Sequence, residues 1–267
     1  MGGVSGALDE WVIPRSHPRY HSLVLRERLV EGFEKGLVVP QGLIAHGRGE
    51  AFDYILGERT HPFAERAVRA AVAYMLTSRH PVISVNGNMA ALAPRELVQL
   101  SELTGAPLEV NLFYRSEERV KAIVQHLREH GAEVVLGLGC SKKRLPGLES
   151  ARGIVCEEGI YSADFVLVGI EDGDRTEALR RAGKVVAAID LNPFSRTAQK
   201  ADITIVDEAT RALRLAVRLA AEMRGWSRGR LEEVIQSYDN RAVLSEAFKA
   251  MLERLSHAAS KGVILEP

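Results

Sequence analysis

The chain has 267 residues, 46% of them hydrophobic, so it is long enough to bury a sizeable core. Its 35 Lys and Arg residues balance its 35 Asp and Glu residues, which argues against a general nucleic-acid-binding protein with a basic surface. No apolar run approaches the roughly 20 residues of a membrane span, and we expect a soluble cytoplasmic protein without a membrane partner.

Cys140 and Cys156 are the two cysteines of the sequence. Two cysteines without a companion histidine cluster cannot form a closed zinc site. No secretory signal is recognisable, and a reducing cytoplasm keeps thiols reduced. We therefore expect both cysteines to be free thiols.

The first part of the chain predicts helices. Residues 1–11 are rich in glycine and lack periodicity, and we expect a flexible N-terminal extension there. Residues 22–79 show helical spacing, strongest in "HPFAERAVRAAVAYMLTSR", where Pro62 suits the first turn. Inside this region, "LIAHGRGEAFDYILGERT" (43–60) crowds charges and glycines together. This stretch is either a solvated turn leading into a surface helix or a flexible loop that wraps an anionic ligand.

Short apolar runs alternate with helical segments over residues 80–225. The runs are apolar throughout, as expected for parallel strands that are covered on both faces. This alternation predicts βαβ units and an α/β fold with a Rossmann-like layered parallel sheet. Helices over residues 226–267 complete one predicted domain (12–267), and the N-terminal helices are expected to pack on one edge. The predicted strands are "PVISVNG", "PLEVNLFY", "AEVVLGLG", "ADFVLVGI", "KVVAAID" and "ADITIVD", with a loop over 140–160.

Polar residues follow the predicted strands, and ligands of open parallel sheets bind at the carboxyl ends of strands. Asn86-Gly87-Asn88 could bind a ligand or simply form a turn, because Asn and Gly tolerate left-handed backbone and Asn caps helices. The Lys142-Lys143-Arg144 run could bind a phosphate group, although such a basic run is more commonly a solvated loop.

Asp190 is the most informative of these strand-end residues. A carboxylate after an apolar strand is well placed to accept hydrogen bonds from ribose hydroxyls. Helix capping is the rival role, although Pro193 and Phe194 make an early helix start less natural. Arg196 follows within about a turn, where its planar guanidinium could bind phosphate.

Several common sites are excluded. Gly137-Leu138-Gly139 lacks the third glycine and the later acidic residue of a dinucleotide site. A P-loop and a GxSxG nucleophile motif are absent, and the histidines are too scattered for HExxH. Spacing alone thus predicts an anion- or nucleotide-binding α/β protein.

Several long stretches, taken together, resemble one family, the archaeal phosphopantothenate synthetases, also called 4-phosphopantoate–β-alanine ligases. The resemblance runs from about Ile13 to Gly225, and the stretches are far more specific than a short motif. They are "IPRSHPRYHSL" (13–23), "GLIAHGRGEAFDYILGERT" (42–60), "HPVISVNGNMAALAP" (80–94), "NLFYRSEERVKAI" (111–123), "EEGIYSADFVLVGIEDGDRTEAL" (157–179) and "DLNPFSRTAQKADITIVDEATRA" (190–212).

The resemblance implies an enzyme of coenzyme A biosynthesis. Such an enzyme joins 4-phosphopantoate to β-alanine with ATP and releases 4′-phosphopantothenate, AMP and diphosphate. The resemblance also implies a homodimer. Carried over position by position, the implied ATP-binding residues are Arg26, Arg48, Asp190, Leu191, Asn192, Arg196, Thr197, Glu208 and Ala209.

Release of AMP implies an acyl-adenylate, whose phosphate charge must be met by arginines, backbone N–H groups and Mg²⁺. We expect Arg26 and Arg48 in this role, with Arg48 on the glycine-framed loop. His46 is a candidate base for the β-alanine amine, or it orients the loop through a hydrogen bond. No protein ligand for a metal is predicted. By the strand-end rule, the predicted substrate-binding residues are Asn86, Asn88, Tyr114, Arg115 and Lys142.

Two other functions fit the same sheet. One is a nucleotide-dependent kinase or phosphotransferase acting on a small acid, which would release ADP in place of AMP. The other is a regulatory protein that senses ATP without turnover. The number of polar strand ends, more than one nucleotide requires, argues against the second.

Overall fold

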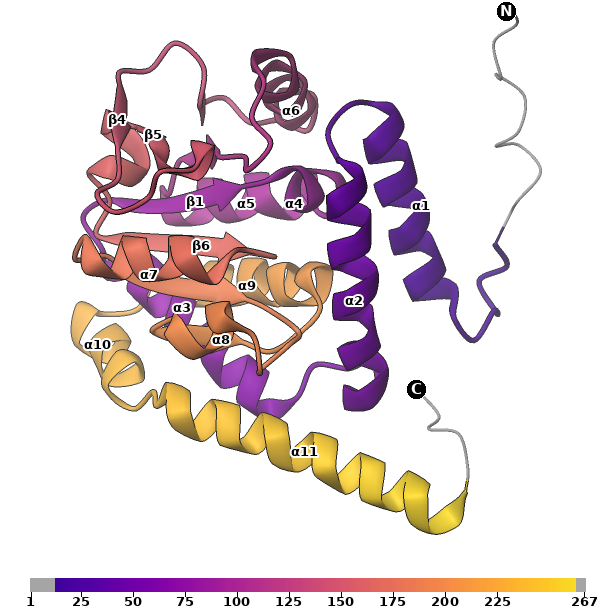
Figure 1. Ribbon diagram of the computed structural model, residues 1–267. Coiled ribbons are helices and arrows are strands. Elements are labelled where there is room, and N and C mark those ends of the chain that lie inside the picture. Colours follow the sequence, from indigo (N-terminus) through magenta and orange to yellow (C-terminus); the bar gives the residue numbers. More distant parts are fainter. Residues whose placement is uncertain (1–12, 263–267) are drawn as a thin grey trace, which may run out of the picture.

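The predicted apolar runs form one parallel sheet in the computed structural model, which describes residues 13–262 (Figure 1). The strand order β3-β2-β1-β6-β7-β8 is that of doubly wound nucleotide-binding folds. The predicted α/β class is confirmed, whereas residues 1–11, the predicted extension, lie outside the described residues. The strands are β1 (Pro81–Val85), β2 (Leu108–Val110), β3 (Val135–Leu136), β6 (Phe165–Gly169), β7 (Val185–Ile189) and β8 (Ile203–Ile205).

Both faces of the sheet are buried, which explains why its strands are apolar at successive positions. Ile83 pairs in register with Leu167 and belongs to one hydrophobic core, whereas the neighbouring pair Val82 and Val166 belongs to a second core. The first core packs against α3 (Pro62–Thr77), α5 (Pro94–Thr104), α6 (Glu117–Glu129) and α9 (Ala209–Met223). The second core includes residues of α7 (Gly173–Arg181) and of the π-helical turn η2 (Glu157–Tyr161), together with Ala201, which directly follows α8 (Arg196–Lys200).

The remaining helices surround these layers. The N-terminal helices do not pack on one edge of the sheet as we expected, because α3 covers a face and α2 stands beside the carboxyl ends of the strands (Figure 1). No helix within residues 13–262 is long and apolar enough to cross a membrane. These helices are α1 (Tyr20–Glu34), α2 (Pro40–Leu56), α4 (Gly87–Leu92), α10 (Arg228–Gln236), α11 (Asn240–Lys261) and the 3₁₀ turn η1 (Ala151–Gly153).

The expectation of a flexible loop around Arg48 was wrong, because residues 40–56 form α2. Pro40 occupies the first turn, and Gly57 ends the helix in the left-handed conformation with φ of 87°. Glycines cost a helix roughly 1 kcal/mol each. Packing of Leu56 in the core and ion pairs from Glu50 and Asp53 to other helices offset that cost.

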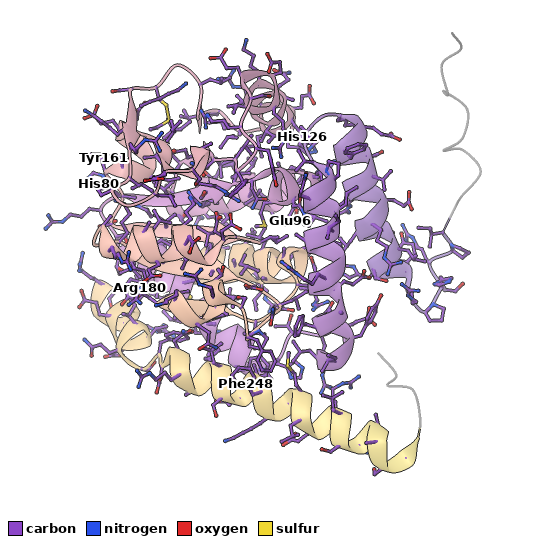
Figure 2. All side chains as sticks on the ribbon, in the orientation of Figure 1. His80, Glu96, His126, Tyr161, Arg180 and Phe248 are labelled. Carbon is purple, nitrogen blue, oxygen red and sulfur yellow. A yellow bond between two sulfur atoms is a disulfide. The ribbon has the colours of Figure 1, made fainter. Side chains whose placement is uncertain are left out.

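The expectation of free thiols was also wrong, because Cys140 and Cys156 form a disulfide (Figure 2). The predicted loop over 140–160 contains an antiparallel hairpin of β4 (Lys142–Arg144) and β5 (Ile154–Cys156). Lys142 pairs with Cys156, which brings the Cα atoms of the two cysteines to 5.6 Å. The exposed, charged β4 has no apolar alternation, so no strand could be recognised there from the sequence.

Candidate active site

Three adjoining pockets lie at the carboxyl edge of the sheet, where α2 faces the strand ends. The first pocket, about 830 Å³, lies between α2 and the segments that follow β6, β7 and β8. The second pocket, about 820 Å³, lies where β1 and β6 meet, which is the point of the sheet where the strand order reverses. Ligands of doubly wound sheets bind at such a reversal. The third pocket adjoins the loop of the β4–β5 hairpin and the start of α7.

The first pocket brings together most of the residues predicted to bind ATP. His46 and Arg48 project from α2, and Asp190 follows β7. Arg48 is exposed and makes no hydrogen bond or ion pair with the rest of residues 13–262. The pocket is also lined by Leu191, Asn192, Glu208 and Ala209.

Asp190 lines the first pocket, and two hydrogen bonds orient its carboxylate. Its Oδ1 accepts a hydrogen bond from the Asn192 N–H at 2.9 Å, and its Oδ2 accepts one from the Ser195 hydroxyl at 2.5 Å. Burial raises the pKa of Asp190, and these hydrogen bonds and the charge of Arg48 oppose the shift. The carboxylate is therefore oriented, with further acceptor capacity for a ligand hydroxyl.

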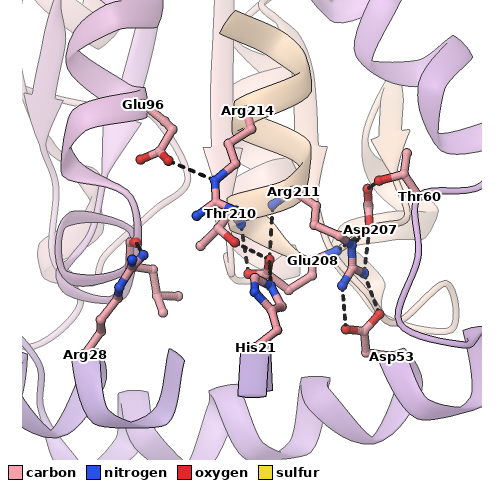
Figure 3. Close-up of polar contacts among 11 residues, drawn as sticks. His21, Arg28, Asp53, Thr60, Glu96, Asp207, Glu208, Thr210, Arg211 and Arg214 are labelled. Carbon is pink, nitrogen blue, oxygen red and sulfur yellow. Dashed lines mark hydrogen bonds and ion pairs between the residues drawn. The ribbon is translucent and has the colours of Figure 1, made fainter. Parts of the chain in front are cut away.

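Glu208 has a structural role as well as a place in the first pocket. Its carboxylate caps α9, accepting hydrogen bonds from the Thr210 N–H at 2.8 Å and the Arg211 N–H at 3.1 Å (Figure 3). His21 Nε2 lies 3.5 Å from Glu208 Oε2. Burial alone would raise the pKa of Glu208, but the polar contacts lower it to about 2. Only the backbone of Glu208 remains for a ligand.

His46 faces the same pocket from α2. Burial lowers its pKa, and the nearby carboxylates of Glu50 and Glu208 only partly oppose the shift. The imidazole is therefore neutral at physiological pH, where it can accept a proton or donate a hydrogen bond.

Three residues predicted to bind ATP lie outside the first pocket. Arg26 pairs with Glu50 of α2 at 3.0 Å, and Thr197 is buried with its hydroxyl donating to the Glu171 carbonyl at 2.6 Å. Arg196 lines the third pocket and pairs with Asp174 at 2.8 Å.

The second pocket brings together three of the five predicted substrate residues. Asn86, Asn88 and Tyr114 line it, but Asn86 caps α4 and Asn88 donates to the Gly42 carbonyl at 2.8 Å. Arg115 instead donates to the Gly137 carbonyl, and Lys142 is exposed on β4. Neither Arg115 nor Lys142 lines the second pocket.

Two arginines that the sequence analysis missed supply positive charge to the second pocket. Arg119 donates to the carbonyls of Leu37 and Tyr114, and no carboxylate within residues 13–262 pairs with it. Arg152 is buried and donates to Glu171 Oε2 at 2.8 Å. Arg152 comes from the hairpin loop, and no strand-end signal could have identified it.

Glu171 and Asp172 were also missed, although only Ile170 separates them from the end of β6. The strand-end rule, applied to "ADFVLVGI", would have found them. Glu171 is fully engaged by Arg152 and Arg175, both buried, whereas Asp172 lines all three pockets.

No group of three His, Cys, Asp or Glu residues within the described part of the chain could hold a metal ion. The site therefore offers oriented carboxylates, arginines and a neutral histidine around two joined pockets. Such a set can hold a phosphorylated ligand beside a nucleotide and meet negative charge that develops between them.

Comparison with known proteins points to one group of enzymes. The family described as phosphopantothenate/pantothenate synthetase matches residues 63–254. A 4-phosphopantoate–β-alanine ligase of Thermococcus kodakarensis is 55% identical over 252 residues, which cover 94% of this chain and 96% of that protein. The enzyme of the same name from Methanosarcina mazei is 49% identical over 251 residues, which cover 93% and 98% of the two chains.

Proposed function

Because the chain belongs to the phosphopantothenate/pantothenate synthetase family, we propose that it is a 4-phosphopantoate–β-alanine ligase of coenzyme A biosynthesis. It condenses the two acids at the expense of ATP and releases 4′-phosphopantothenate, AMP and diphosphate. The observation that carries the proposal is a pair of joined pockets at the strand ends, both bordered by Arg48.

The first pocket is the proposed ATP site. Asp190 accepts hydrogen bonds from the ribose hydroxyls, because its carboxylate is oriented and retains acceptor capacity. Arg48 meets the phosphates, since its guanidinium has no competing partner within residues 13–262. Leu191, Asn192 and the backbone of Glu208 and Ala209 complete the proposed nucleotide contacts.

Arg26, Arg196 and Thr197, which the resemblance also implies as ATP-binding residues, lie outside the first pocket. Arg26 would have to exchange Glu50 for a phosphate, and Arg196 would have to leave Asp174. We propose that Arg26 acts mainly by holding α2, and that Thr197 acts mainly by holding Glu171.

The second pocket is the proposed 4-phosphopantoate site. Arg119 gives the substrate phosphate a positive charge that no carboxylate neutralises within residues 13–262. Tyr114 and Asn88 supply polar contacts for the rest of the acid. The substrate carboxylate then lies toward Arg48, where the two pockets join. We assign Arg115 and Lys142 no direct contact, because neither lines the pocket.

The proposed chemistry occurs at that junction. The phosphopantoate carboxylate attacks the α-phosphorus of ATP, an acyl-adenylate forms and diphosphate leaves. Arg48 stabilises the charge that develops on the phosphate oxygens. Neutral His46 donates a hydrogen bond to the reacting phosphate. Because the joined pockets align the two substrates, positioning supplies much of the rate enhancement.

Mg²⁺ accompanies ATP in this proposal. Because residues 13–262 contain no group of three metal ligands, phosphate oxygens and water would supply most of its coordination, with at most one or two carboxylates. Chelation with excess EDTA is expected to stop turnover, and added Mg²⁺ to restore it.

The test is a product assay with purified protein, ATP, Mg²⁺, 4-phosphopantoate and β-alanine, with the adenine nucleotides separated by chromatography. We expect one AMP per 4′-phosphopantothenate, and only when both acids are present. ADP in place of AMP would contradict an adenylate and favour an acyl phosphate or a kinase. Absence of turnover would leave only a binding protein.

We further propose a homodimer that works in the cytoplasm. Exposed apolar side chains, such as Leu252 and Leu255 on α11, give a second copy a surface to cover. The disulfide does not argue against the cytoplasm, because intracellular proteins of hyperthermophilic archaea also carry disulfides.

A further inference from the structure

We propose that Asp172 binds the ammonium group of β-alanine and accepts its proton, and that β-alanine arrives through the third pocket. This inference rests on the proposed ligase function and adds a catalytic residue to it. The amine has to reach the acyl carbon at the junction of the first and second pockets, and a group there has to receive a proton.

The position of Asp172 carries the argument. Among residues 13–262 it is the residue that lines all three pockets, because it follows β6 and begins α7. The second and third pockets also share Phe113 and Arg152. A small molecule in the third pocket therefore meets Asp172 on its way to the junction.

The carboxylate of Asp172 is available to a ligand. It stands at the N-cap of α7 but makes no capping hydrogen bond, and its side chain is 53% exposed. Glu171 is engaged by two arginines, and Asp190 accepts hydrogen bonds from Ser195 and Asn192. Among these three carboxylates, that of Asp172 accepts no hydrogen bond within residues 13–262, and its one ion pair there is with Arg152 at 3.9 Å.

Arg152 provides the second charge that β-alanine needs. Its side chain is 7% exposed, its Nε has no hydrogen-bond partner, and Nε lies 3.9 Å from Asp172 Oδ2. β-Alanine carries an ammonium and a carboxylate separated by two methylene groups, so it can place one charge on each member of this pair. A buried N–H donor without a partner costs free energy that a bound carboxylate would recover.

The residues around Asp172 also favour acceptance of a proton by its carboxylate. Partial burial of Asp172 and the neighbouring charge of Glu171 raise the pKa of Asp172, and Asp174 adds to the shift. Arg152 and Arg175 oppose it from the hairpin loop and from α7. A carboxylate with a raised pKa is a better base toward an ammonium group.

The ammonium gives one proton to Asp172, and the amine nitrogen bonds to the acyl carbon of the adenylate. The bond from that carbon to the phosphate oxygen breaks, and AMP leaves with the electron pair. The second proton passes from nitrogen to the departing phosphate oxygen. Asp172 returns its own proton to water through the third pocket.

Two assays on the full chain separate the half-reactions. Exchange of labelled diphosphate into ATP with 4-phosphopantoate reports adenylate formation, and AMP release with β-alanine reports the complete reaction. For Asp172→Asn we expect exchange within about threefold of the wild type and a loss of about 100-fold or more in kcat/KM for β-alanine. The retained exchange also shows that the variant is folded.

Hydroxylamine provides a sharper readout, because it is largely uncharged at neutral pH and needs no proton acceptor before attack. Asp172→Asn is expected to keep hydroxamate formation from the adenylate. Glu133→Gln is the matched control: it removes an exposed carboxylate that lines none of the three pockets, and it should retain all three activities.

Two results would overturn the assignment. One is unchanged ligation of β-alanine by Asp172→Asn, and the other is an equal loss of exchange and ligation, which would place Asp172 in the adenylation step. Absence of exchange in the wild type would refute the proposed function itself, and the assignment of Asp172 with it.

Discussion

Neighbouring carboxylates at the strand ends have opposite pKa shifts. Burial raises the pKa of Asp190 and of Asp207, although Arg211 and Thr60 contact Asp207. Glu208 is equally buried, but the N–H groups of α9 and His21 outweigh the burial and lower its pKa. Residue type does not decide this behaviour, and neither does the number of donors, because Asp207 also accepts several hydrogen bonds. The balance between burial and polar contacts at each carboxylate decides it.

The low pKa of Glu208 predicts a pH-dependent contribution to stability. Its pKa falls from 4.5 to about 2 on folding, so the ionised form adds about 3 kcal/mol to the free energy of unfolding above pH 4.5. That contribution is lost as the pH falls through about 2. Glu208→Gln should therefore be less stable than the wild type at pH 7, with a gap that narrows toward pH 2.

Urea unfolding of both proteins between pH 7 and pH 2 measures this gap. Glu102→Gln, which removes an exposed carboxylate, is the control and should match the wild type throughout. A gap that stays constant over the whole range would show that the contribution of Glu208 does not depend on its charge.

We expect Arg48 to contribute to catalytic activity but not to the stability of the fold. Arg48→Ala removes a guanidinium that faces both pockets and has no partner within the described residues. We expect kcat/KM for ATP to fall about 100- to 1,000-fold, with an unchanged melting temperature. Arg59→Ala removes an exposed arginine from outside these pockets and serves as the control in steady-state assays. Equal activity of both variants would refute the assignment.

Part of the site could be predicted from the sequence. Asp190 follows an apolar strand directly, so the strand-end rule alone identifies it, and the long resemblance adds Arg48. Arg152 could not be predicted, because a hairpin with a polar, exposed strand carries it to the site from elsewhere. Lys142 satisfied the same rule but lies on that hairpin and not at a strand end of the main sheet.

At the scale of elements, α2 combines two tasks. His46 and Arg48 line the first pocket, and Glu50 and Asp53 pair with neighbouring helices: Glu50 with Arg26 of α1, and Asp53 with Arg211 of α9. The crowding of charge in residues 43–60 therefore has both a structural and a proposed ligand-binding cause.

Breaking the ion pair between Asp53 of α2 and Arg211 of α9 should lower the free energy of unfolding substantially. Arg211 contacts Asp53 at 2.6 Å and Asp207 at 2.7 Å, and all three side chains are largely buried (Figure 3). Arg211→Met leaves two buried carboxylates without a cation, and we expect a loss of about 3–5 kcal/mol in the free energy of unfolding. Arg214, which is also on α9 but is 50% exposed, pairs with Glu96 of α5, and Arg214→Met should cost about 0–1 kcal/mol. Chemical denaturation compares the two, and similar losses would contradict the difference in burial.

The disulfide should stabilise the hairpin that carries Arg152. It closes a segment with a sequence separation of 16 residues, and loops of that size gain roughly 3 kcal/mol when cross-linked. We expect a thiol reductant to lower the free energy of unfolding of the wild type by about this amount. The double variant Cys140→Ser/Cys156→Ser should not respond to the reductant, and mass spectrometry without reduction should detect the linked peptides only in the wild type.

At the scale of the whole molecule, the parallel sheet could be predicted from the sequence, whereas the position of α2 beside its strand ends could not. Strands such as 81–85 and 185–189 are apolar because both faces are covered, and that pattern survives in the sequence. The place of α2 beside the strand ends depends on long-range pairs such as Asp53–Arg211, separated by 158 residues, which no local pattern contains.

The proposed dimer is tested by the mass of the particle in solution. Light scattering after size-exclusion chromatography should give twice the 29.3 kDa of one chain. Leu252→Glu/Leu255→Glu places charge on the exposed apolar part of α11 and should shift the mass toward one chain. His257→Glu, also exposed on α11, is the control. A wild type that elutes with the mass of one chain would refute the dimer.

Asp172 lines all three pockets, and this arrangement has a consequence for how much ATP the reaction consumes. An adenylate at the junction would lie against α2, and the amine would reach it from the third pocket, so in the proposed mechanism it has no need to dissociate between the two half-reactions. Retention of the mixed anhydride in the site would limit its hydrolysis while it awaits the amine. Scarcity of β-alanine should then slow the consumption of ATP instead of causing it to be wasted.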